Sequence, residues 1–477
     1  MEYKRISGEG ACRIVKNGNT IGFSGFTPVG YPKVVPLKLA ERKDLRVNVY
    51  TGASVGEEID TALVDMMDLR MPYMTNKVLR EAINDGRVRF IDTRIGKFTE
   101  ELQSGFYPKV DVAIVEACAL KDGGFVPTTS VGAVPAFVSQ AETVIIELNS
   151  EQPESLEGIH DIFLLPAAPR DPIPLKDPRD RIGKPFVSTA NKEVFVVETE
   201  AKDSSRALAP PAEEHRKIAE NLISFFQKEV ASGKLPKNLL PLQSGVGNIA
   251  NAVTEGLKSS GFEHLVFYTE VLQDCILQLL RDNVADFVSA TSISLSPQKL
   301  ERFYGEIDDL RQKLVLRPQD ISNCPEIISR LGVISMNGAL EADIYGNVNS
   351  THIDGREIVN GLGGSEDFTS NACTSIFFSP STKKNGAISF IVPMASHVDH
   401  TEHDVDVIVT EQGVADLRGK EPEERAKEII ERCAHPAYKE KLYEYLRSCE
   451  GGHIRVNRRK ADEWYKNLRE SGSMLGP

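Results

Sequence analysis

The sequence predicts an α/β fold made of two tandem open α/β domains with mainly parallel sheets. Strand-like and helix-like segments alternate in the first half of the chain, which is typical of βαβ units around a parallel sheet. The same opening then recurs, because Phe23-Ser-Gly-Phe26 and Leu242-Gln-Ser-Gly-Val-Gly247 both join a strand-like run to a helix-like run. At 477 residues the chain is also too long for one ordinary core, so we expect two domains.

Four buried strands are predicted in the first half from runs of β-branched and apolar residues. They cover residues 20–25, 45–50, 111–116 and 143–148. The first ends in a glycine turn and leads into a helix-like stretch that extends to about Arg42. Strands separated by helices in this way favour parallel pairing.

A polar segment with paired prolines, residues 203–211, is the predicted domain boundary, which gives domains of residues 1–210 and 211–477. Proline-rich residues 166–185 predict a long irregular loop, a kind of segment that is often functional. From about Ala426 the tail is expected to be helical and charged and to pack as an appendage. The boundary precedes an amphipathic helix with these apolar residues: Ile218, Leu222, Phe225 and Phe226.

Composition argues against several classes of partner. The formal net charge of -13 disfavours nucleic acid but leaves room for an anionic substrate. No apolar run is long enough to span a bilayer, and the N-terminus lacks the apolar core of a signal peptide. The seven cysteines are scattered without a Cys-x-x-Cys pair, which favours reduced thiols over disulfides or a zinc site. We therefore expect a cytoplasmic protein with no membrane partner.

Glu270 is the main candidate for chemistry. It ends an apolar strand-like run, residues 264–270, and functional sites in open α/β sheets gather at the carboxyl ends of strands. A glutamate is ionised at neutral pH unless its surroundings raise its pKa, so it can attack an acyl carbon without a base. The alternative is a carboxylate that caps the helix-like run of residues 272–280.

Two glycine-rich segments can supply backbone N–H groups for such an attack. The first, residues 244–253, places Gly245 and Gly247 before a helix start at Asn248, where free N–H groups favour a phosphate or an oxyanion. The second, residues 361–368, lets a ligand approach the backbone but lacks the Gly-Lys-Ser/Thr ending of a P-loop. A structural turn is the alternative for each segment.

Histidines recur at every third position between residues 396 and 404. They are His397, His400 and His403. Imidazoles and carboxylates bind metals, yet this spacing in extended chain scatters the rings over both faces. We therefore predict structural histidines and no metal site. Cys118 and Cys373 lack a histidine in a familiar catalytic arrangement, so both are expected to be buried.

A series of short motifs occurs along the chain in an order that matches a known family. The motifs are Phe23-Ser-Gly-Phe-Thr27, Gln243-Ser-Gly-Val-Gly-Asn248, Tyr268-Thr-Glu-Val-Leu-Gln273, Arg317-Pro-Gln-Asp-Ile-Ser-Asn323, Gly363-Gly-Ser-Glu-Asp-Phe368, Val392-Pro-Met394, Ser396 to Asp404 and Thr410-Glu-Gln-Gly-Val-Ala-Asp-Leu-Arg418. With them the chain resembles the class I coenzyme A transferases, specifically the acetyl-CoA hydrolase/transferase branch. The resemblance extends to the Gly-Ser-Met-Leu-Gly run at the C-terminal end. It implies two domains of the CoA-transferase type with the active site between them.

The resemblance also assigns roles to individual residues. Glu270 matches the family's catalytic glutamate, Val246 the backbone amide of its oxyanion hole, and Asn323 the side-chain amide that joins it. The residues expected to contact the CoA thioester are Gly247, Asn248, Gly363, Gly364 and Ser365. The residues expected to shape the carboxylate pocket are Ser54, Thr75, Arg206 and Glu411.

These roles imply an acyl-CoA:carboxylate CoA-transferase that moves CoA between short-chain acids such as acetate, succinate, propionate and butyrate. The implied mechanism is ping-pong through a glutamyl-CoA thioester, with no tightly bound cofactor, CoA and acyl-CoA as substrates, and a homodimeric assembly. Acyl-CoA hydrolysis at the same site is the nearest alternative, and a non-catalytic CoA-binding regulator is a more distant one. A dinucleotide-dependent oxidoreductase is disfavoured, because no Gly-x-Gly-x-x-Gly motif precedes an acidic residue at the required spacing.

Overall fold

The structure is a computed structural model that describes residues 3–204 and 210–476. The chain divides into two compact units. Unit 1 comprises Met1–Ala207, Val266–Leu331 and Asn360–Asp367, and unit 2 comprises Leu208–Leu265, Gly332–Val359 and Phe368–Pro477. The predicted domains 1–210 and 211–477 are continuous stretches, whereas each unit is built from separate stretches, and Glu270 belongs to unit 1.

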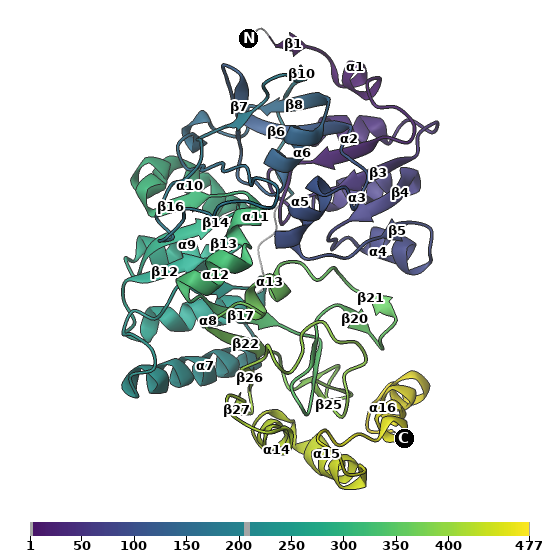
Figure 1. Cartoon of the computed structure of the whole chain (residues 1–477), viewed down its shortest axis with the longest axis vertical. Helices are drawn as coiled ribbons and strands as arrows, with labels where there is room; N and C mark the ends of the chain where they lie inside the picture. The colour runs from purple at the N-terminus through teal and green to yellow at the C-terminus, as the bar shows by residue number, and fades with distance from the viewer. Residues whose placement is uncertain (1–2, 205–209, 477) are drawn as a thin grey trace. The chain divides into compact units, whose positions relative to one another are not determined.

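A mainly parallel sheet forms the centre of unit 1 (Figure 1). Its strands lie in the order β1 (Lys4–Arg5), β10 (Glu193–Thr199), β8 (Thr143–Asn149), β6 (Val112–Lys121), β2 (Thr20–Phe23), β3 (Val47–Tyr50), β4 (Met67–Met71) and β5 (Arg89–Phe90). β7 (Gly124–Pro127) pairs antiparallel with β6 and with β9 (Val187–Ser188), beside the end of β6. The four strands expected from the sequence correspond to β2, β3, β6 and β8, so the α/β prediction is confirmed for this unit.

Helices follow the strands of unit 1, and two smaller sets of strands complete it. The helices are α1 (Gly8–Cys12), α2 (Val34–Leu39), α3 (Glu57–Leu63), α4 (Lys77–Asn84), α5 (Ile95–Gln103), α6 (Val134–Gln140), α9 (Asp274–Arg281), α10 (Pro297–Leu310), α11 (Gln319–Ser322), α12 (Pro325–Leu331) and α13 (Ser365–Thr369). The remaining strands are β16 (Leu314–Leu316), β14 (Ala285–Ala290) and β12 (Leu265–Tyr268), which neighbour one another, and β13 (Val271–Gln273), which pairs with β15 (Ser292–Ser294). Strand β6 is buried over its first eight residues, as expected for a parallel strand covered on both faces.

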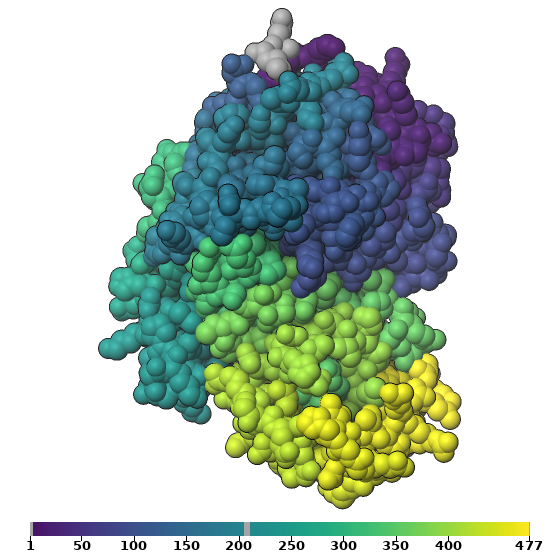
Figure 2. All heavy atoms as spheres, viewed as in Figure 1, coloured from purple at the N-terminus to yellow at the C-terminus, as the bar shows by residue number. Residues whose placement is uncertain are grey.

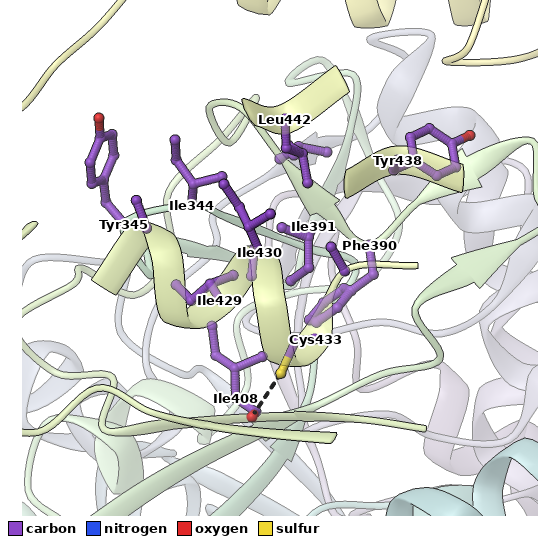
Figure 3. Close-up of a cluster of buried hydrophobic side chains, with 14 of the residues drawn as sticks. Ile344, Tyr345, Phe390, Ile391, Ile408, Ile429, Ile430, Cys433, Tyr438 and Leu442 are labelled. Carbon is purple, nitrogen blue, oxygen red and sulfur yellow. Dashed lines mark hydrogen bonds between the residues drawn. The ribbon is translucent and has the colours of Figure 1, made fainter. Parts of the chain in front are cut away.

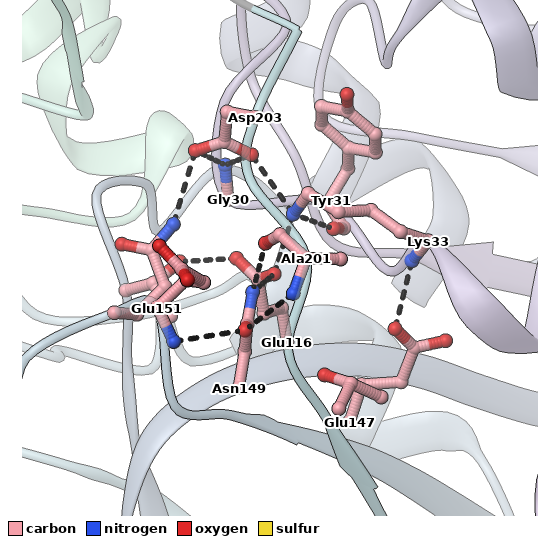
Figure 4. A network of polar contacts seen from close by, with 12 residues as sticks. Gly30, Tyr31, Lys33, Glu116, Glu147, Asn149, Glu151, Ala201 and Asp203 are labelled. Atoms are coloured by element: carbon pink, nitrogen blue, oxygen red, sulfur yellow. Dashed lines mark hydrogen bonds and ion pairs between the residues drawn. The ribbon is translucent and has the colours of Figure 1, made fainter. Parts of the chain in front are cut away.

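Buried charges fix the loop between β2 and α2 in unit 1 (Figure 4). Lys33 Nζ lies 2.5 Å from Oε1 of Glu116 and 2.9 Å from Oδ1 of Asp203. Glu147 accepts hydrogen bonds from the first backbone N–H groups of α2, including Val35 N at 2.6 Å, so it acts as an N-terminal cap. Burial raises the pKa of Glu116 to about 7 although Lys33 opposes that shift. The loop therefore depends on charges that are paired away from water.

Unit 2 contains a second parallel sheet, ending in one antiparallel strand. Its strands lie in the order β11 (Leu242–Ser244), β17 (Ile334–Gly338), β22 (Thr374–Phe378), β26 (Val407–Thr410) and β27 (Gly413–Asp416). Short strands form small separate sheets beside it: β18 (Glu341–Asp343) with β19 (Val348–Asn349) and β25 (Ile391–Val392), β20 (His352–Ile353) with β21 (Glu357–Ile358), and β23 (Thr382–Lys383) with β24 (Ile388–Ser389). The long helices are α7 (Glu213–Ala231), α8 (Asn248–Ser259), α14 (Pro422–Cys433), α15 (Pro436–Ser448) and α16 (Arg458–Ser471). The apolar face predicted for α7 is buried, which confirms that helix.

The C-terminal helices are part of the core of unit 2, not the predicted appendage. Ile429 and Ile430 of α14 and Leu442 of α15 belong to one buried cluster with Ile391 of β25 and Ile408 of β26 (Figure 3). Their outer faces form the yellow surface region of Figure 2. The apolar residues of these helices are spaced along one face, so a tail that is charged overall still buries a continuous stripe. No helix in the described part of the chain is long and apolar enough to cross a membrane.

Candidate active site

Glu270 lies in unit 1 two residues after the end of β12 and directly before β13, near the carboxyl end of a strand as the sequence predicted. Its backbone carbonyl accepts hydrogen bonds from Thr291 N at 2.9 Å and Ser292 N at 3.1 Å, between β14 and β15. Residue 270 is therefore not the cap of α9, because β13 lies between them and the helix begins at Asp274. The chain on both sides of the carboxylate is held by neighbouring strands.

Asn323 contacts Glu270 directly. It follows the last turn of α11, and its Nδ2 donates a hydrogen bond of 2.8 Å to Glu270 Oε1. The hydroxyl of Ser322 donates to Asn323 Oδ1 at 2.8 Å, which fixes the amide with its NH2 group toward the glutamate. An amide carries two N–H donors, so one remains for another acceptor beside the carboxylate.

Electrostatics at Glu270 favour a reactive carboxyl group. Burial raises its pKa to about 7, and the hydrogen bond from Asn323 lowers it only partly. The carboxylate is therefore poorly solvated near neutral pH, which makes it a better nucleophile than a glutamate in water. With a pKa of about 7, the carboxyl group can gain or lose a proton near neutral pH.

The predicted glycine loop comes against this pair. A Cβ added at Gly364 would collide with Nδ2 of Asn323 and Oε1 of Glu270, so glycine is required there for space. Gly363 has φ +64°, a left-handed conformation that also favours glycine. Ser365 begins α13, and its hydroxyl donates to the carbonyl of Leu362 at 2.9 Å, which closes the loop on itself. The structure thus brings Gly364 against Glu270 and Asn323, with the neighbouring Gly363 and Ser365 in the same loop.

Residues that the sequence did not identify anchor this loop. Asp92 Oδ1 accepts from Leu362 N at 2.8 Å, and Ile95 N donates to the carbonyl of Gly363 at 3.1 Å. Asp367 Oδ2 accepts from Gly96 N at 2.8 Å at the start of α5. Burial raises the pKa of Asp367 well above its usual value, and Glu270 adds to that shift. The loop is therefore held to residues 92–96 along most of its length.

A small apolar cluster includes Val271, the residue that follows Glu270. Phe26, Ala53, Ile95 and Val271 form a small buried cluster, and the partly buried Tyr73 packs against it. Burial raises the pKa of Tyr73, with a further contribution from Glu270, which places the phenol within electrostatic range of the carboxylate. Of these residues the sequence motifs included Phe26 and Val271, but no pattern indicated that the five would meet.

The remaining unit 1 candidates differ in their surroundings. Ser54 is buried in the loop after β3, whereas Thr75 is exposed directly before Asn76, the N-cap of α4. Arg206 lies outside the described residues. Roles for these three residues in a carboxylate pocket stay predictions.

Val246, Gly247, Asn248 and Glu411 belong to unit 2. The first three form the turn from β11 into α8, which begins at Asn248 as predicted, and Gly247 has φ 136°. Burial acts to raise the pKa of Glu411, but hydrogen bonds from Ser381 and Gln412 lower it below its ordinary value. Glu411 is thus held as an anion. Its part in substrate binding, like that of the 246–248 turn, stays a prediction.

The two cysteines considered as nucleophiles behave differently. Cys118 is buried, as predicted, and burial raises the pKa of its thiol to about 12, so it is not a nucleophile. Cys373 is exposed, so the prediction of a buried residue was wrong there. Cys373 lies directly before β22, and the sequence did not indicate that the residue before this strand would be exposed.

Two family models match the chain. The acetyl-CoA hydrolase/transferase N-terminal domain matches residues 1–182, and the acetyl-CoA hydrolase/transferase C-terminal domain matches residues 300–446. The two matches cover both ends of the predicted motif series. They include the residues that hold Asn323 and the glycine loop.

Several known proteins are similar over nearly the whole chain. The succinyl-CoA:acetate CoA-transferase of Clostridium kluyveri is 47% identical, and the alignment covers 99% of this chain and 90% of that protein. The acetyl-CoA hydrolase of Schizosaccharomyces pombe is 45% identical, with 96% and 94% covered. The propanoyl-CoA:succinate CoA transferase of Escherichia coli is 41% identical, with 100% and 99% covered.

Solved structures share the fold at lower identity. RipA from Yersinia pestis superposes with a TM-score of 0.73 at 22% identity, covering 92% of this chain and 96% of that chain. The 4-hydroxybutyrate CoA-transferase from Porphyromonas gingivalis gives a TM-score of 0.64 at 21% identity, covering 93% and 97%. Together with the family models and the closely similar sequences, the motif series and the Glu270–Asn323 pair lead to one assignment: this chain is a member of the acetyl-CoA hydrolase/transferase family of enzymes.

Proposed function

We propose that the protein is an acyl-CoA:carboxylate CoA-transferase in which Glu270 is the nucleophile. The observation that carries this proposal is the desolvated Glu270 carboxylate, bound by Asn323 and approached closely by Gly364. Two relatives at 47% and 41% identity are named as CoA-transferases, one acting between succinate and acetate and one between propanoate and succinate. Short-chain acids are therefore the substrates to test first.

The reaction would proceed in two matched halves. Glu270 attacks the acyl-CoA carbonyl, the carbon–sulfur bond breaks, and the products are an acyl-glutamyl anhydride and CoA thiolate. The thiolate then attacks the glutamyl carbonyl, which releases the first acid as its carboxylate and leaves a Glu270–CoA thioester. An incoming carboxylate reverses both steps. The energy of the thioester is kept, because no step consumes water.

Negative charge develops on a carbonyl oxygen in each of these steps. A donor aimed at such an oxygen contributes about 2.7–4 kcal/mol in comparable sites. The second N–H of Asn323 is suited to this task, and the resemblance assigns a matching role to the backbone amide of Val246. Binding of the long CoA chain away from the reacting atoms can add energy that favours the transition state.

Hydrolysis of acyl-CoA is the second candidate. The acetyl-CoA hydrolase of Schizosaccharomyces pombe is 45% identical to this chain, close to the value for the transferases. Both activities share the attack by Glu270 and differ in whether water or a carboxylate captures the intermediate. Transfer is favoured here because an acceptor carboxylate can attack the intermediate without a general base, whereas water needs a base to activate it.

One experiment addresses both candidates. Purified protein is mixed with acetyl-CoA in the presence or absence of succinate, and acyl-CoA species are followed by chromatography. Transfer predicts succinyl-CoA formation and slow CoA release without succinate, and rapid release without any acceptor would overturn it in favour of hydrolysis.

The intermediate is tested separately by intact mass. We expect a mass increase of one CoA on the wild type and on Glu263→Gln, an exposed control, but not on Glu270→Gln. Transfer activity without that adduct in the wild type, or an adduct in Glu270→Gln, would contradict the assigned nucleophile.

Two further features belong to the proposal. We expect a homodimer, measurable by light scattering of the purified protein, and a cytoplasmic location, measurable by fractionation. Both rest on the sequence and the family resemblance.

A further inference from the structure

His352, His397 and Asp399 meet in unit 2, although two of them lie 45 or more positions from the third along the chain. One side-chain atom from each residue lies within 4.8 Å of the corresponding atom of the others. The Asp399 side chain is 5% exposed and that of His397 is 38% exposed, so the group is partly open to solvent. We refer to these three residues as the histidine–aspartate cluster.

Backbone pairing brings the cluster together. Val348 N donates to the carbonyl of His400 at 2.8 Å, and His400 N donates back to Val348 at 3.0 Å. The pair is antiparallel, so residues after Val348 lie beside residues before His400. That register brings His352 next to His397, and their ring centroids are 4.1 Å apart. The histidine spacing within residues 396–404 did not reveal this partner.

The distances between the side-chain atoms fit a metal ion. His397 Nε2 lies 3.2 Å from Asp399 Oδ1. Zinc bonds to imidazole nitrogen and carboxylate oxygen are about 2.0–2.1 Å long, and tetrahedral geometry then separates adjacent ligand atoms by about 3.3 Å. The pair therefore already has nearly the separation of two ligands of one ion. Across the whole group the ligand atoms lie within 4.8 Å of one another, so the side chains must move closer together to bind one ion.

A buried hydroxyl orients two of the three ligands. Thr351 Oγ1 lies 2.7 Å from His352 Nδ1 and donates its one hydrogen to Asp399, 2.8 Å away. It must then accept from the N–H at Nδ1 of His352, which leaves Nε2 of that ring unprotonated and able to bind a metal. Ser350 N also donates to Asp399 at 2.6 Å. Such outer hydrogen bonds to ligands are typical of metal sites.

We propose that His352, His397 and Asp399 bind Zn²⁺, with water as the fourth ligand. Two imidazoles and one carboxylate suit zinc, whereas Ca²⁺ and Mg²⁺ need more oxygen ligands than the cluster offers. The ion would join the segment that carries β20 to the loop of residues 396–400. This replaces the expectation from spacing alone that the histidines hold no metal. His400 and His403 are not part of the cluster, since His400 packs its ring against Phe377 and the His403 side chain is 82% exposed.

The test uses the untagged full-length protein, because a polyhistidine tag binds the same ions. The protein is stripped with EDTA and titrated with Zn²⁺ in competition with a chromophoric chelator, and retained metal is measured after gel filtration. We expect one Zn²⁺ per chain and a higher melting temperature when Zn²⁺ is present. His352→Ala and His397→Ala should each weaken binding at least about 10-fold and remove the thermal shift, while Thr351→Val should weaken it about 10–100-fold.

His403→Ala is the matched control, because it removes a nearby exposed imidazole from the same segment and should bind Zn²⁺ like the wild type. Asp399 is left unchanged, since its hydrogen bonds to Ser350 and Thr351 make any substitution a test of folding as well. Absence of bound Zn²⁺ in the wild type, or equal binding in the wild type, His352→Ala and His397→Ala, would overturn the proposal. The three side chains would then form a structural polar cluster without a metal. CoA transfer is not used as a readout, so this test is independent of the proposed function.

Discussion

Nδ2 of Asn323 donates to Oε1 of Glu270 at 2.8 Å, and among the described residues this amide is the group that lowers the pKa of the carboxyl group against the effect of burial. Burial and this hydrogen bond act in opposite directions on the same proton. The ionisation of the proposed nucleophile thus depends on a single side chain, and that dependence can be measured.

Asn323→Ala should lower transfer and move its pH dependence upward. Activity requires the ionised carboxyl group, so in the wild type it should rise as pH increases through about 7. Losing the donor raises the pKa of Glu270 further, and losing the oxyanion contact should reduce kcat by about 10²–10³. A pH–rate profile of both proteins checks this.

Ser322→Ala provides a graded comparison. It removes the hydroxyl that fixes the Asn323 amide but keeps the amide itself, so its profile should move in the same direction by a smaller amount. A wild-type profile for Asn323→Ala would show that the contact does not control the ionisation.

Gly364→Ala should reduce transfer at least about 100-fold, because its methyl group would collide with both Glu270 and Asn323 and displace reacting groups. Gly305→Ala is the matched control: nothing lies within 4 Å of the added methyl, and the residue is in α10. Steady-state assays with retained helical circular dichroism check the pair. Equal activity of the two variants would mean that the glycine loop can shift to accommodate the methyl group without displacing Glu270 or Asn323.

Glu270→Gln should stabilise the protein above neutral pH. The folded pKa of about 7 exceeds the ordinary value of 4.5, so between these values the folded chain keeps a proton that the unfolded chain releases. Stability therefore falls as pH rises through that range and stays lower above it. Since Glu270 is only partly buried, we expect the amide to raise the free energy of unfolding by about 1–3 kcal/mol at pH 8.

Urea unfolding at pH 8 and pH 5 measures this effect, with the exposed Glu263→Gln as control. The gain should be smaller at pH 5, where the folded carboxyl group is protonated and neutral. A gain that does not depend on pH would have a cause other than the charge of residue 270.

Lys33→Met should destabilise unit 1 strongly. It leaves Glu116 and Asp203 buried without their cation, a change that typically costs about 3–5 kcal/mol. Lys38→Met on the neighbouring helix α2 removes a half-exposed cation and should change stability by less than about 0.5 kcal/mol. Urea unfolding of both variants at pH 8 measures the two losses of stability. Similar unfolding midpoints would show that the buried charges are solvated or neutral.

The sequence predicted much of the fold because local patterns of apolar residues and glycines indicate where strands and helices begin and end. Strands β6 and β8 are mostly apolar and β-branched runs, and α8 begins at Asn248, just after the glycines that follow β11. Glu270, Asn323 and Gly364 were grouped by resemblance, and the structure brings the three together.

Contacts between distant segments could not be predicted in this way. Asp92 and Gly96 anchor the glycine loop from about 270 residues away, and His352 reaches His397 through a backbone register that neither residue specifies. The sequence suggested that the C-terminal helices form an appendage because most of their residues are polar or charged. Only a narrow apolar stripe on each helix packs into the core. Such contacts are set by tertiary packing, and residue type alone does not report them.

The interleaved course of the chain has a consequence for how such an enzyme can arise or be divided. Residues 266–331 and 360–367 return to unit 1 after the chain has already entered unit 2. A gene split at residue 210 would deliver Glu270, Asn323 and Gly364 on the polypeptide that lacks the sheet around which unit 1 is formed. The first fragment would lack residues 266–331 and 360–367 of its own unit, so unit 1 can be completed only when both parts of the chain are present.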